Sequence, residues 1–258
     1  MEQTNDYATK ESHSLQTMTK RYPAKHFINK EDNKALVQLI EQNSLATLLY
    51  IDNNAELHVS HIPFHFNESP RLTLDEQNND SLLGYELMGH VSNDHPVAHQ
   101  LKNKSHTNIT LIFHSEEDYI SPNDVNIEHG GKQNVPTWNY AKVHVSGDVE
   151  EITDIDDKYQ QMIKTTDYFE ETDISQNSIN NAQGPISNEK STHWTLETVP
   201  KRAIESMFKA ITLFTLTITD IEGRFKVSQN KPDAIRKQIA EQVAKRNKQR
   251  LAEKIHSS

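Results

Sequence analysis

The stretches of this chain with β-strand character follow one another through short connections, and this feature limits its possible folds more than any other. Leu45–Ile51 and Leu57–Phe64 are short apolar runs, and Asp52–Asn54 between them offers turn residues, so we predict a hairpin here. Trp138–Val149 has valines at alternate positions and is the longest predicted strand. About seven or eight strands are predicted in all. Strands joined in this way favour a mainly β fold, an antiparallel barrel with peripheral helices, over a doubly wound sheet.

Two residues inside the predicted strands carry positional information. Pro63 lacks an amide hydrogen and therefore predicts an edge, a bulge or the end of its strand. Gly147 predicts a bulge or a close approach of another chain segment. Apolar residues at helical spacing lie before, between and after the predicted strands. The predicted helices are about Asn29–Asn43, Pro96–Leu101, Asp154–Phe169, Ala203–Lys209 and a final helix from Pro232.

Composition divides the chain into three parts. Residues 1–20 are polar and without periodicity, and we predict a disordered extension. Residues 21–230 form the predicted barrel domain, with a long inserted loop at 171–192 that is rich in Asn, Ser and Gln. Residues 231–258 form the predicted basic C-terminal helix, with eight Lys and Arg against three Asp and Glu. Because the formal net charge of the chain is −10, this +5 segment has the opposite sign to residues 1–230.

Several classes of protein are excluded by what the sequence lacks. The chain has no cysteine, which excludes disulfides, thiolate metal sites and a cysteine nucleophile. It has seven glycines and neither a GxGxxG nor a Walker motif, so side chains must hold any nucleotide phosphate. The first 20 residues have no apolar core of a secretory signal, and no run is long enough to span a bilayer. We expect a cytoplasmic protein.

Fourteen histidines raise the question of a metal site. One group lies on the second predicted strand and another follows the next strand; they are His58, His61, His65 and His90, His95, His99. Neither group comes with HExxH or with an acidic partner at useful spacing, so no metal is predicted. A serine hydrolase is also disfavoured, because GxSxG is absent.

Two polar stretches are candidates for binding. Val135–His144 combines a hydroxyl, an indole, an amide and a phenol, which suit a planar heteroaromatic ligand, although an aromatic core strand is an equally good interpretation. Gly223–Asn230 places Arg224 and Lys226 on one face of an extended segment, where they would meet a phosphate or simply form a solvated edge.

Eight short motifs follow one another in a fixed order along the chain. Six of them are Tyr22–Phe27, Leu45–Leu48, Ser60–Pro63, Gly89–Val91, Tyr119–Pro122 and Met207–Ile211, and the two most specific are Val135–Tyr140 and Lys226–Asn230. Taken together, they resemble the PaiB family of FMN-binding negative transcriptional regulators, from about Tyr22 to the final helix. The resemblance implies a split β-barrel of the pyridoxamine-phosphate-oxidase type, usually a homodimer with FMN near the subunit interface.

The resemblance also implies which residues bind FMN. They are Ser60, His61, His90, Tyr119, Ser121, Thr137, Trp138, Asn139, Lys226 and Gln229. Charge favours Lys226, together with His61, at the phosphate end. The sequence departs from the family pattern at Asn123–Val125, at Ser92–Pro96 and at Thr212–Leu213.

Three functions remain open at this point. The first is an FMN-binding regulator, which would have to contact DNA through the basic C-terminal helix, since no helix-turn-helix is evident. The second is a flavin-dependent oxidoreductase on the same barrel, for which no catalytic residue is identified. The third is a binding protein of the same fold without flavin. The resemblance favours the regulator, and the choice between enzyme and non-enzyme stays open with a preference for the latter.

Overall fold

The structure is a computed structural model, and it describes residues 27–29, 32–70, 81–102, 107–126, 135–180 and 194–258. The predicted extension at 1–20 lies outside these residues. Within the described part of the chain, no helix is both long enough and apolar enough to cross a bilayer.

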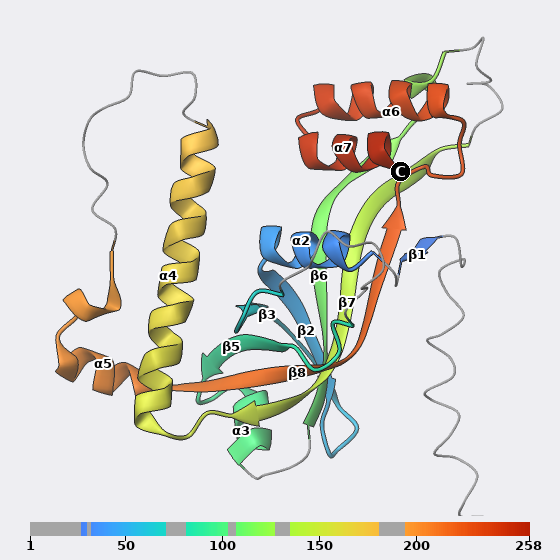
Figure 1. Cartoon of the computed structure of the whole chain (residues 1–258). Helices are drawn as coiled ribbons and strands as arrows, with labels where there is room; N and C mark the ends of the chain where they lie inside the picture. Colours follow the sequence, from blue (N-terminus) through green and yellow to red (C-terminus); the bar gives the residue numbers. More distant parts are fainter. Residues whose placement is uncertain (1–26, 30–31, 71–80, 103–106, 127–134, 181–193) are drawn as a thin grey trace, which may run out of the picture. The chain divides into compact units, whose positions relative to one another are not determined.

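A sheet of mostly antiparallel strands forms the framework (Figure 1). Its strand order is β3-β2-β6-β7-β8-β5-β4, with β1 paired to β8. Antiparallel pairing joins β2 to β3 and β6, β5 to β4 and β8, and β1 to β8. The strands are β1 (Ile28–Asn29), β2 (Leu45–Ile51), β3 (Leu57–Pro63), β4 (His65–Phe66), β5 (Glu86–Ser92), β6 (Thr107–Ile120), β7 (Thr137–Glu151) and β8 (Ile211–Lys226). The mainly β fold class predicted from the sequence is confirmed.

Helices lie outside the sheet, as predicted. The α-helices are α2 (Asn33–Gln42), α3 (Pro96–Lys102), α4 (Ile155–Asn180), α5 (Lys201–Phe208), α6 (Asp233–Lys245) and α7 (Gln249–Ser257), and the 3₁₀ turns are η3 (Pro122–Asp124) and η6 (Leu196–Thr198). Asp32 caps α2 by accepting a hydrogen bond from the Ala35 amide at 2.9 Å, which explains why the helix begins there.

The predicted hairpin of β2 and β3 is confirmed, with Leu45 opposite Pro63 and Ile51 opposite Leu57. Ala55 in its turn has a positive φ of 62°. Asp52 stabilises the turn, because its Oδ1 accepts hydrogen bonds from the amides of Asn54 and Glu56, each at 2.9 Å. Pro63 is the last residue of β3, and β3 is the first strand in the strand order and so has a neighbour on one side only. The missing amide hydrogen of Pro63 therefore removes no hydrogen bond to a further strand.

The chain divides into two compact units. We call them the terminal unit (1–30, 116–141 and 223–258) and the central unit (31–115 and 142–222). Strands β6, β7 and β8 contribute residues to both. The central unit has an apolar cluster, which includes Met162, Leu196, Ile204, Phe208 and Leu213, that joins α4 to α5 and to β8. In the same unit Gly147 lies so close to Thr217 and Leu216 that a Cβ would collide with them, which confirms the predicted close approach.

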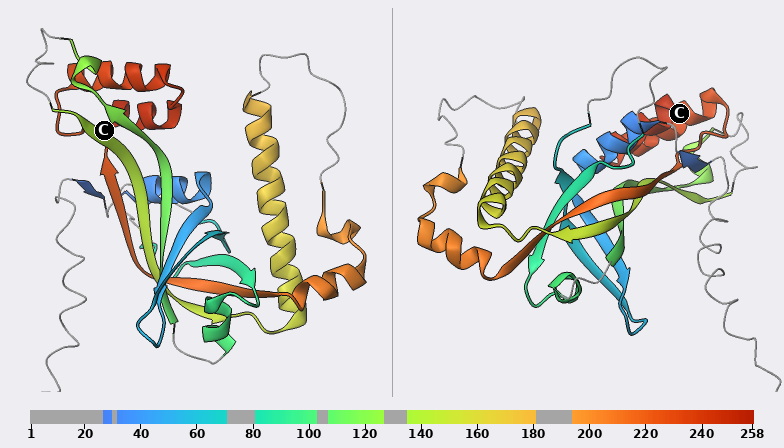
Figure 2. Two further views of the ribbon diagram at one scale, coloured as in Figure 1. Left: turned by 180° about the vertical axis from the view of Figure 1, so that it is seen from behind. Right: turned by 60° about the horizontal axis from the view of Figure 1, so that its bottom comes forward.

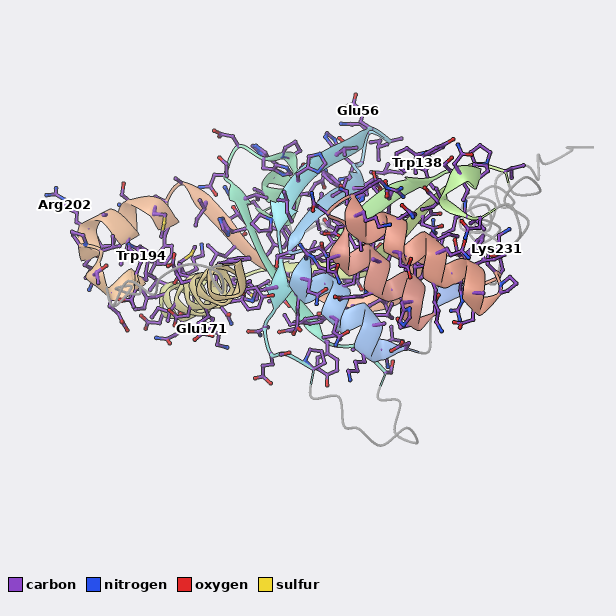
Figure 3. All side chains as sticks on the ribbon, turned by 90° about the horizontal axis from the view of Figure 1, so that it is seen from above. Glu56, Trp138, Glu171, Trp194, Arg202 and Lys231 are labelled. Carbon is purple, nitrogen blue, oxygen red and sulfur yellow. The ribbon has the colours of Figure 1, made fainter. Side chains whose placement is uncertain are left out.

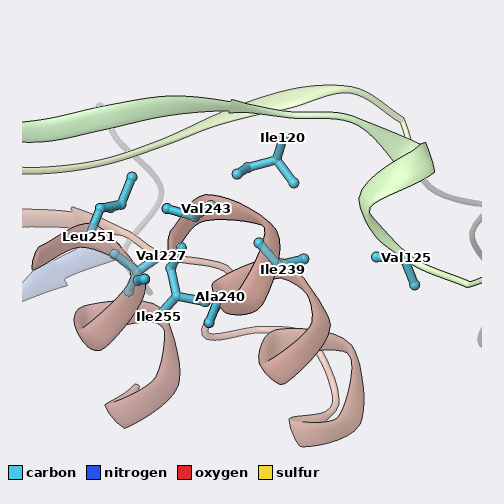
Figure 4. Close-up of a cluster of buried hydrophobic side chains, with 9 residues drawn as sticks. Ile120, Val125, Val227, Ile239, Ala240, Val243, Leu251 and Ile255 are labelled. Carbon is cyan, nitrogen blue, oxygen red and sulfur yellow. The ribbon is translucent and has the colours of Figure 1, made fainter. Parts of the chain in front are cut away.

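The terminal unit has a second apolar cluster, in which α6 and α7 lie side by side (Figures 2 and 4). Its buried side chains are Ile120, Val125, Val227, Ile239, Ala240, Val243, Leu251, Ala252 and Ile255. The single helix predicted over 231–258 is therefore wrong. Asn247, with a φ of 61°, ends α6, and the amide of Lys248 donates to the Val243 carbonyl at 3.3 Å. This is the usual left-handed helix end, which asparagine tolerates.

The loop predicted over 171–192 is wrong in its first half, because α4 continues to Asn180. Residues 181–192 lie outside the described part of the chain. The polar composition suggested a loop, but Ile155–Asn180 contains neither glycine nor proline, and polar residues cost a helix only a few tenths of a kcal/mol each. The first glycine and proline after Phe169 are Gly184 and Pro185.

Candidate functional site

The predicted site residues fall into two groups, one in each unit. The terminal unit holds Tyr119, Ser121, Thr137, Trp138, Asn139, Lys226 and Gln229, and the central unit holds Ser60, His61 and His90. We describe the two groups separately.

Thr137 and Lys226 meet where β7 begins and β8 ends. The Lys226 ammonium donates a hydrogen bond to Thr137 Oγ1 at 2.5 Å. The same ammonium lies 5.9 Å from the centroid of the half-buried Phe27 ring, at the outer limit of a cation–π contact. Phe27 was not predicted as a site residue, although it ends one of the motifs of the resemblance. A cation, a hydroxyl and an aromatic ring are thus brought together from three distant stretches.

Asn139 is the buried polar residue of this group, with 1% of its surface exposed. Its Nδ2 donates to Ser228 Oγ at 2.8 Å, and Ser228 has a positive φ of 61°. Asn139 Oδ1 is buried and has no hydrogen-bond partner among the described residues. A buried carbonyl oxygen without a partner costs roughly 1–3 kcal/mol, so this atom calls for a donor from a water molecule or a ligand.

Trp138 lies between Thr137 and Asn139 but points to the opposite face of β7, because side chains alternate along a strand. Its side chain is 54% exposed (Figure 3) and pairs edge-to-face with Tyr119, with ring centroids 6.0 Å apart. The sequence interpretation grouped these rings with Thr137 and Asn139. The pleat separates them into an exposed aromatic pair on one face and a polar group on the other.

Ser121 and Gln229 have local structural roles. Ser121 caps η3: its Oγ accepts from the Asn123 amide and its own amide donates to Asp124 Oδ2. Gln229 Oε1 accepts from the Val227 amide at 2.9 Å, and its Nε2 donates to the Phe225 carbonyl at 2.5 Å. These bonds hold the bend after β8, and motif resemblance alone does not distinguish such a role from ligand binding.

In the central unit, Ser60, His61 and His90 occupy different environments. Ser60 Oγ is hydrogen-bonded to His95 Nε2 at 2.7 Å. Burial lowers the pKa of His90 below its usual value of 6.5, which favours a neutral ring. His61 is exposed, and its Nδ1 lies 3.2 Å from Thr47 Oγ1.

Three residues that the sequence interpretation missed extend from His61 across the sheet. Thr47 Oγ1 is 3.1 Å from His114 Nε2, and His114 Nδ1 is 2.8 Å from the Lys142 ammonium. The hairpin register pairs Thr47 with His61, so a prediction of this register from the sequence would have placed these two residues together. His114 and Lys142 are distant in sequence, and only the strand order brings them to this row.

Asp52, Glu56 and His58 also lie close together, with one potential ligand atom of each within 4.8 Å of the others. Both oxygens of Asp52 already have partners: Oδ1 holds the turn amides, and Oδ2 is 3.1 Å from His58 Nε2. Glu56 is exposed at the hairpin turn (Figure 3). The hairpin turn accounts for this cluster, and we assign no metal to it.

Comparison with known proteins gives a family and several relatives. Residues 21–220 match a family described as "Putative FMN-binding domain". A protein of Aspergillus fumigatus described as uncharacterized is 27% identical over 75% of this chain and 80% of its own length. The "Protease synthase and sporulation protein PAI 2" of Bacillus subtilis is 21% identical over 79% of this chain and 80% of its own length.

Solved structures with a similar arrangement are also found. The FAD and heme binding protein from Mycobacterium smegmatis is 15% identical, with a TM-score of 0.45 over 78% of this chain and 73% of that one. The flavocytochrome Anf3 from Azotobacter vinelandii is 12% identical, with a TM-score of 0.47 over 80% and 72%.

The family match covers most of the chain, and it includes every predicted site residue except Lys226 and Gln229. The match and the similarity to PAI 2 confirm the resemblance drawn from the short motifs. This chain therefore belongs to the family described as "Putative FMN-binding domain".

Proposed function

We propose that this chain binds FMN in its terminal unit, on the face of β7 that carries Thr137 and Asn139. The observation that carries the proposal is the buried, unpartnered Oδ1 of Asn139 beside the group of Phe27, Thr137 and Lys226. These residues fit a flavin mononucleotide. Phe27 offers an apolar surface to a ring, Asn139 offers an acceptor to a ring N–H, and Lys226 offers a cation to the phosphate or to a ring oxygen. When bound, FMN would supply electron or hydride transfer.

The test is FMN titration, read by quenching of the flavin fluorescence and by the visible spectrum of the purified protein. Lys226→Met should weaken binding about tenfold or more, since it removes the cation offered to the ligand, and Thr137→Val should weaken it less, since it removes only the hydroxyl that positions this cation. Trp138→Ala is the matched control, because it removes a neighbouring side chain on the opposite face of β7, and Trp194→Ala is a control in the central unit. Loss of binding in Trp138→Ala with full binding in Lys226→Met would place the flavin on the other face and overturn the proposal.

We propose further that two copies of the chain associate through the outward face of β2 and β3. Leu57, Val59 and Ile51 are 62%, 55% and 67% exposed on this face, in the register that pairs Ile51 with Leu57. Neighbouring exposed apolar side chains of this size usually mark an interaction surface. Since one patch would meet a second copy of itself, a two-fold dimer is the simplest assembly.

Analytical ultracentrifugation tests the dimer. The wild-type chain should sediment as a dimer, and Leu57→Lys or Val59→Lys should shift it to a monomer with an unchanged circular dichroism spectrum. Leu83→Lys is the control, because Leu83 is also exposed but lies outside β2 and β3. A wild-type monomer at ~50 μM, far above the dissociation constants of stable dimers, would contradict this assembly.

The resemblance of the short motifs to the PaiB family of negative transcriptional regulators favours the regulator as the role of the FMN-binding protein. A DNA selection with and without FMN tests this role, and bound sequences should be released by salt. The alternative, a flavin oxidoreductase, predicts bleaching of the flavin by NADH or NADPH without oxygen. Bleaching without any selected DNA would favour the oxidoreductase.

A further inference from the structure

The turn between β5 and α3 holds a histidine that caps the helix. α3 begins at Pro96, whose backbone nitrogen carries no hydrogen, so the Val97 amide is the first of the helix that needs an acceptor. That acceptor is Nδ1 of His95, at 3.2 Å. The His95 carbonyl accepts the first hydrogen bond within the helix, from the His99 amide at 3.3 Å. Both bonds are typical of an N-cap residue, so His95 is the N-cap of α3.

The bond to Val97 fixes the hydrogen on the His95 ring. Nδ1 accepts a hydrogen bond and carries no hydrogen, so the hydrogen of the neutral ring lies on Nε2. Nε2–H donates to Ser60 Oγ at 2.7 Å, on the inward face of β3. The neutral ring, with one acceptor and one donor, therefore joins α3 to the hairpin of β2 and β3.

A proton on His95 changes these two bonds in opposite ways. The charged ring carries hydrogen on both nitrogens, so no rotation of the ring offers an acceptor to the Val97 amide. The bond to Ser60 is kept and becomes charge-assisted. The added charge also lies at the N-terminus of α3, where the first amides already present a partial positive charge. Protonation thus releases the helix and leaves His95 on the hairpin.

No carboxylate is placed to offset the charge of a protonated His95. Among the described residues none forms an ion pair with it, and Asp94, its neighbour in sequence, is exposed. On the hairpin, the nearby His58 is itself paired with Asp52, with Nε2 and Oδ2 3.1 Å apart. Burial and His58 lower the pKa of His95 below its usual value of 6.5. The other titratable groups on the elements that meet here are Tyr50 on β2, Glu86 and His90 on β5, and His99 and Lys102 on α3.

We propose that His95 is a pH-sensitive cap, which holds the first turn of α3 when it is neutral and releases the Val97 amide when it is protonated. Ser60 holds the ring in both states. His95 lies in Ser92–Pro96, where the sequence departs from the PaiB pattern, so the cap is not implied by the resemblance. It lies within the central unit and does not depend on flavin binding.

Amide hydrogen exchange of the full chain, followed by NMR and corrected for the exchange rate of an unstructured chain, tests the cap. Protection of the Val97 amide should be constant above about pH 7 and about fivefold lower at about pH 5. His95→Asn offers an acceptor that does not titrate, so its protection should stay constant over this range. His99→Gln is the matched control, because His99 is an exposed histidine of the same helix, and it should keep the fall of the wild type. The amide of Val143, which is buried on β7, should stay protected and so exclude general unfolding.

Unchanged protection of Val97 in the wild type, or the same fall in His95→Asn, would overturn the proposal. A second test needs no variant. The ¹⁵N resonances of the His95 ring should show the Nε2–H tautomer above about pH 7, and the ring and the protection of Val97 should titrate with one midpoint. An Nδ1–H tautomer, or two separate midpoints, would exclude His95 as the group that senses the pH.

Discussion

The terminal and central units use charge and apolar surface in opposite ways. In the terminal unit, the basic α6 and α7 direct cations to acids of their own unit: Arg246 pairs with Asp118 at 2.6 Å and with Asp124 at 3.1 Å, and Arg236 pairs with Asp233. Their apolar side chains are buried in one cluster. In the central unit, the outward face of β2 and β3 leaves apolar side chains exposed. Several basic side chains of the terminal unit are therefore partly neutralised by acids of their own unit, whereas the exposed apolar side chains lie in the central unit.

The same contrast holds for the polar site residues. Ser121 and Gln229 of the terminal unit are occupied by bonds that shape the backbone. His61 of the central unit is held from one side only and faces outward on the other. A polar side chain is available to a ligand when the local backbone does not need it, and this difference is not visible in a motif.

The largest expected effect compares one leucine from each unit. Leu251 is fully buried between α6 and α7, so Leu251→Ala should lower the free energy of unfolding by about 3 kcal/mol. In the monomer, at a protein concentration below that at which two copies associate, Leu57→Ala should change it by less than about 0.5 kcal/mol, because that side chain is exposed in the single chain. Urea unfolding measures both. Equal losses of unfolding free energy would show that Leu57 is packed as tightly as Leu251.

A smaller effect is expected at the charge cluster of the terminal unit. Arg246→Met should cost about 1–2 kcal/mol, because Asp118 and Asp124 lose a partly buried partner, and the loss should shrink in high salt. Arg202→Met, on the exposed start of α5, is the control and should be nearly neutral. If Arg246→Met were equally neutral, the pairs of Arg246 with Asp118 and Asp124 would not stabilise the terminal unit.

The smallest effect is a dependence of stability on pH in the central unit. Burial lowers the pKa of His65, which is 2.8 Å from the Phe66 carbonyl and stacks on Tyr168, below its usual value of 6.5. Below pH 6.5 the unfolded chain binds a proton that the folded chain resists, so stability is complete above this value and falls as the pH decreases toward the folded pKa.

His65→Phe keeps a ring at this position, and its unfolding free energy should fall less than that of the wild type between about pH 7 and pH 5. His90 and His95 contribute in the same direction, so some dependence should remain. His256→Gln is the control, because His256 is exposed on α7. An unchanged slope in His65→Phe would exclude His65 as a source of the effect.

Local patterns predicted the local structure well. Turn residues and alternating apolar residues predicted the hairpin of β2 and β3, and Gly147 predicted a close approach. The two wrong predictions both concerned the end of a helix, and both came from using composition in place of residues that end a helix. Polar residues after Phe169 do not end a helix that contains neither proline nor glycine, and Asn247 ended one without either.

The sequence by itself determined the mainly β class, the hairpin and the family, because these depend on short-range periodicity and on motifs. Only the tertiary structure decided which of the candidate residues share a surface. The pleat of β7 separates Trp138 from Thr137 and Asn139, and the order β3-β2-β6-β7 brings His61 and Lys142 into one row. Pairing between strands distant in sequence sets these positions, and no local pattern encodes which strands become neighbours.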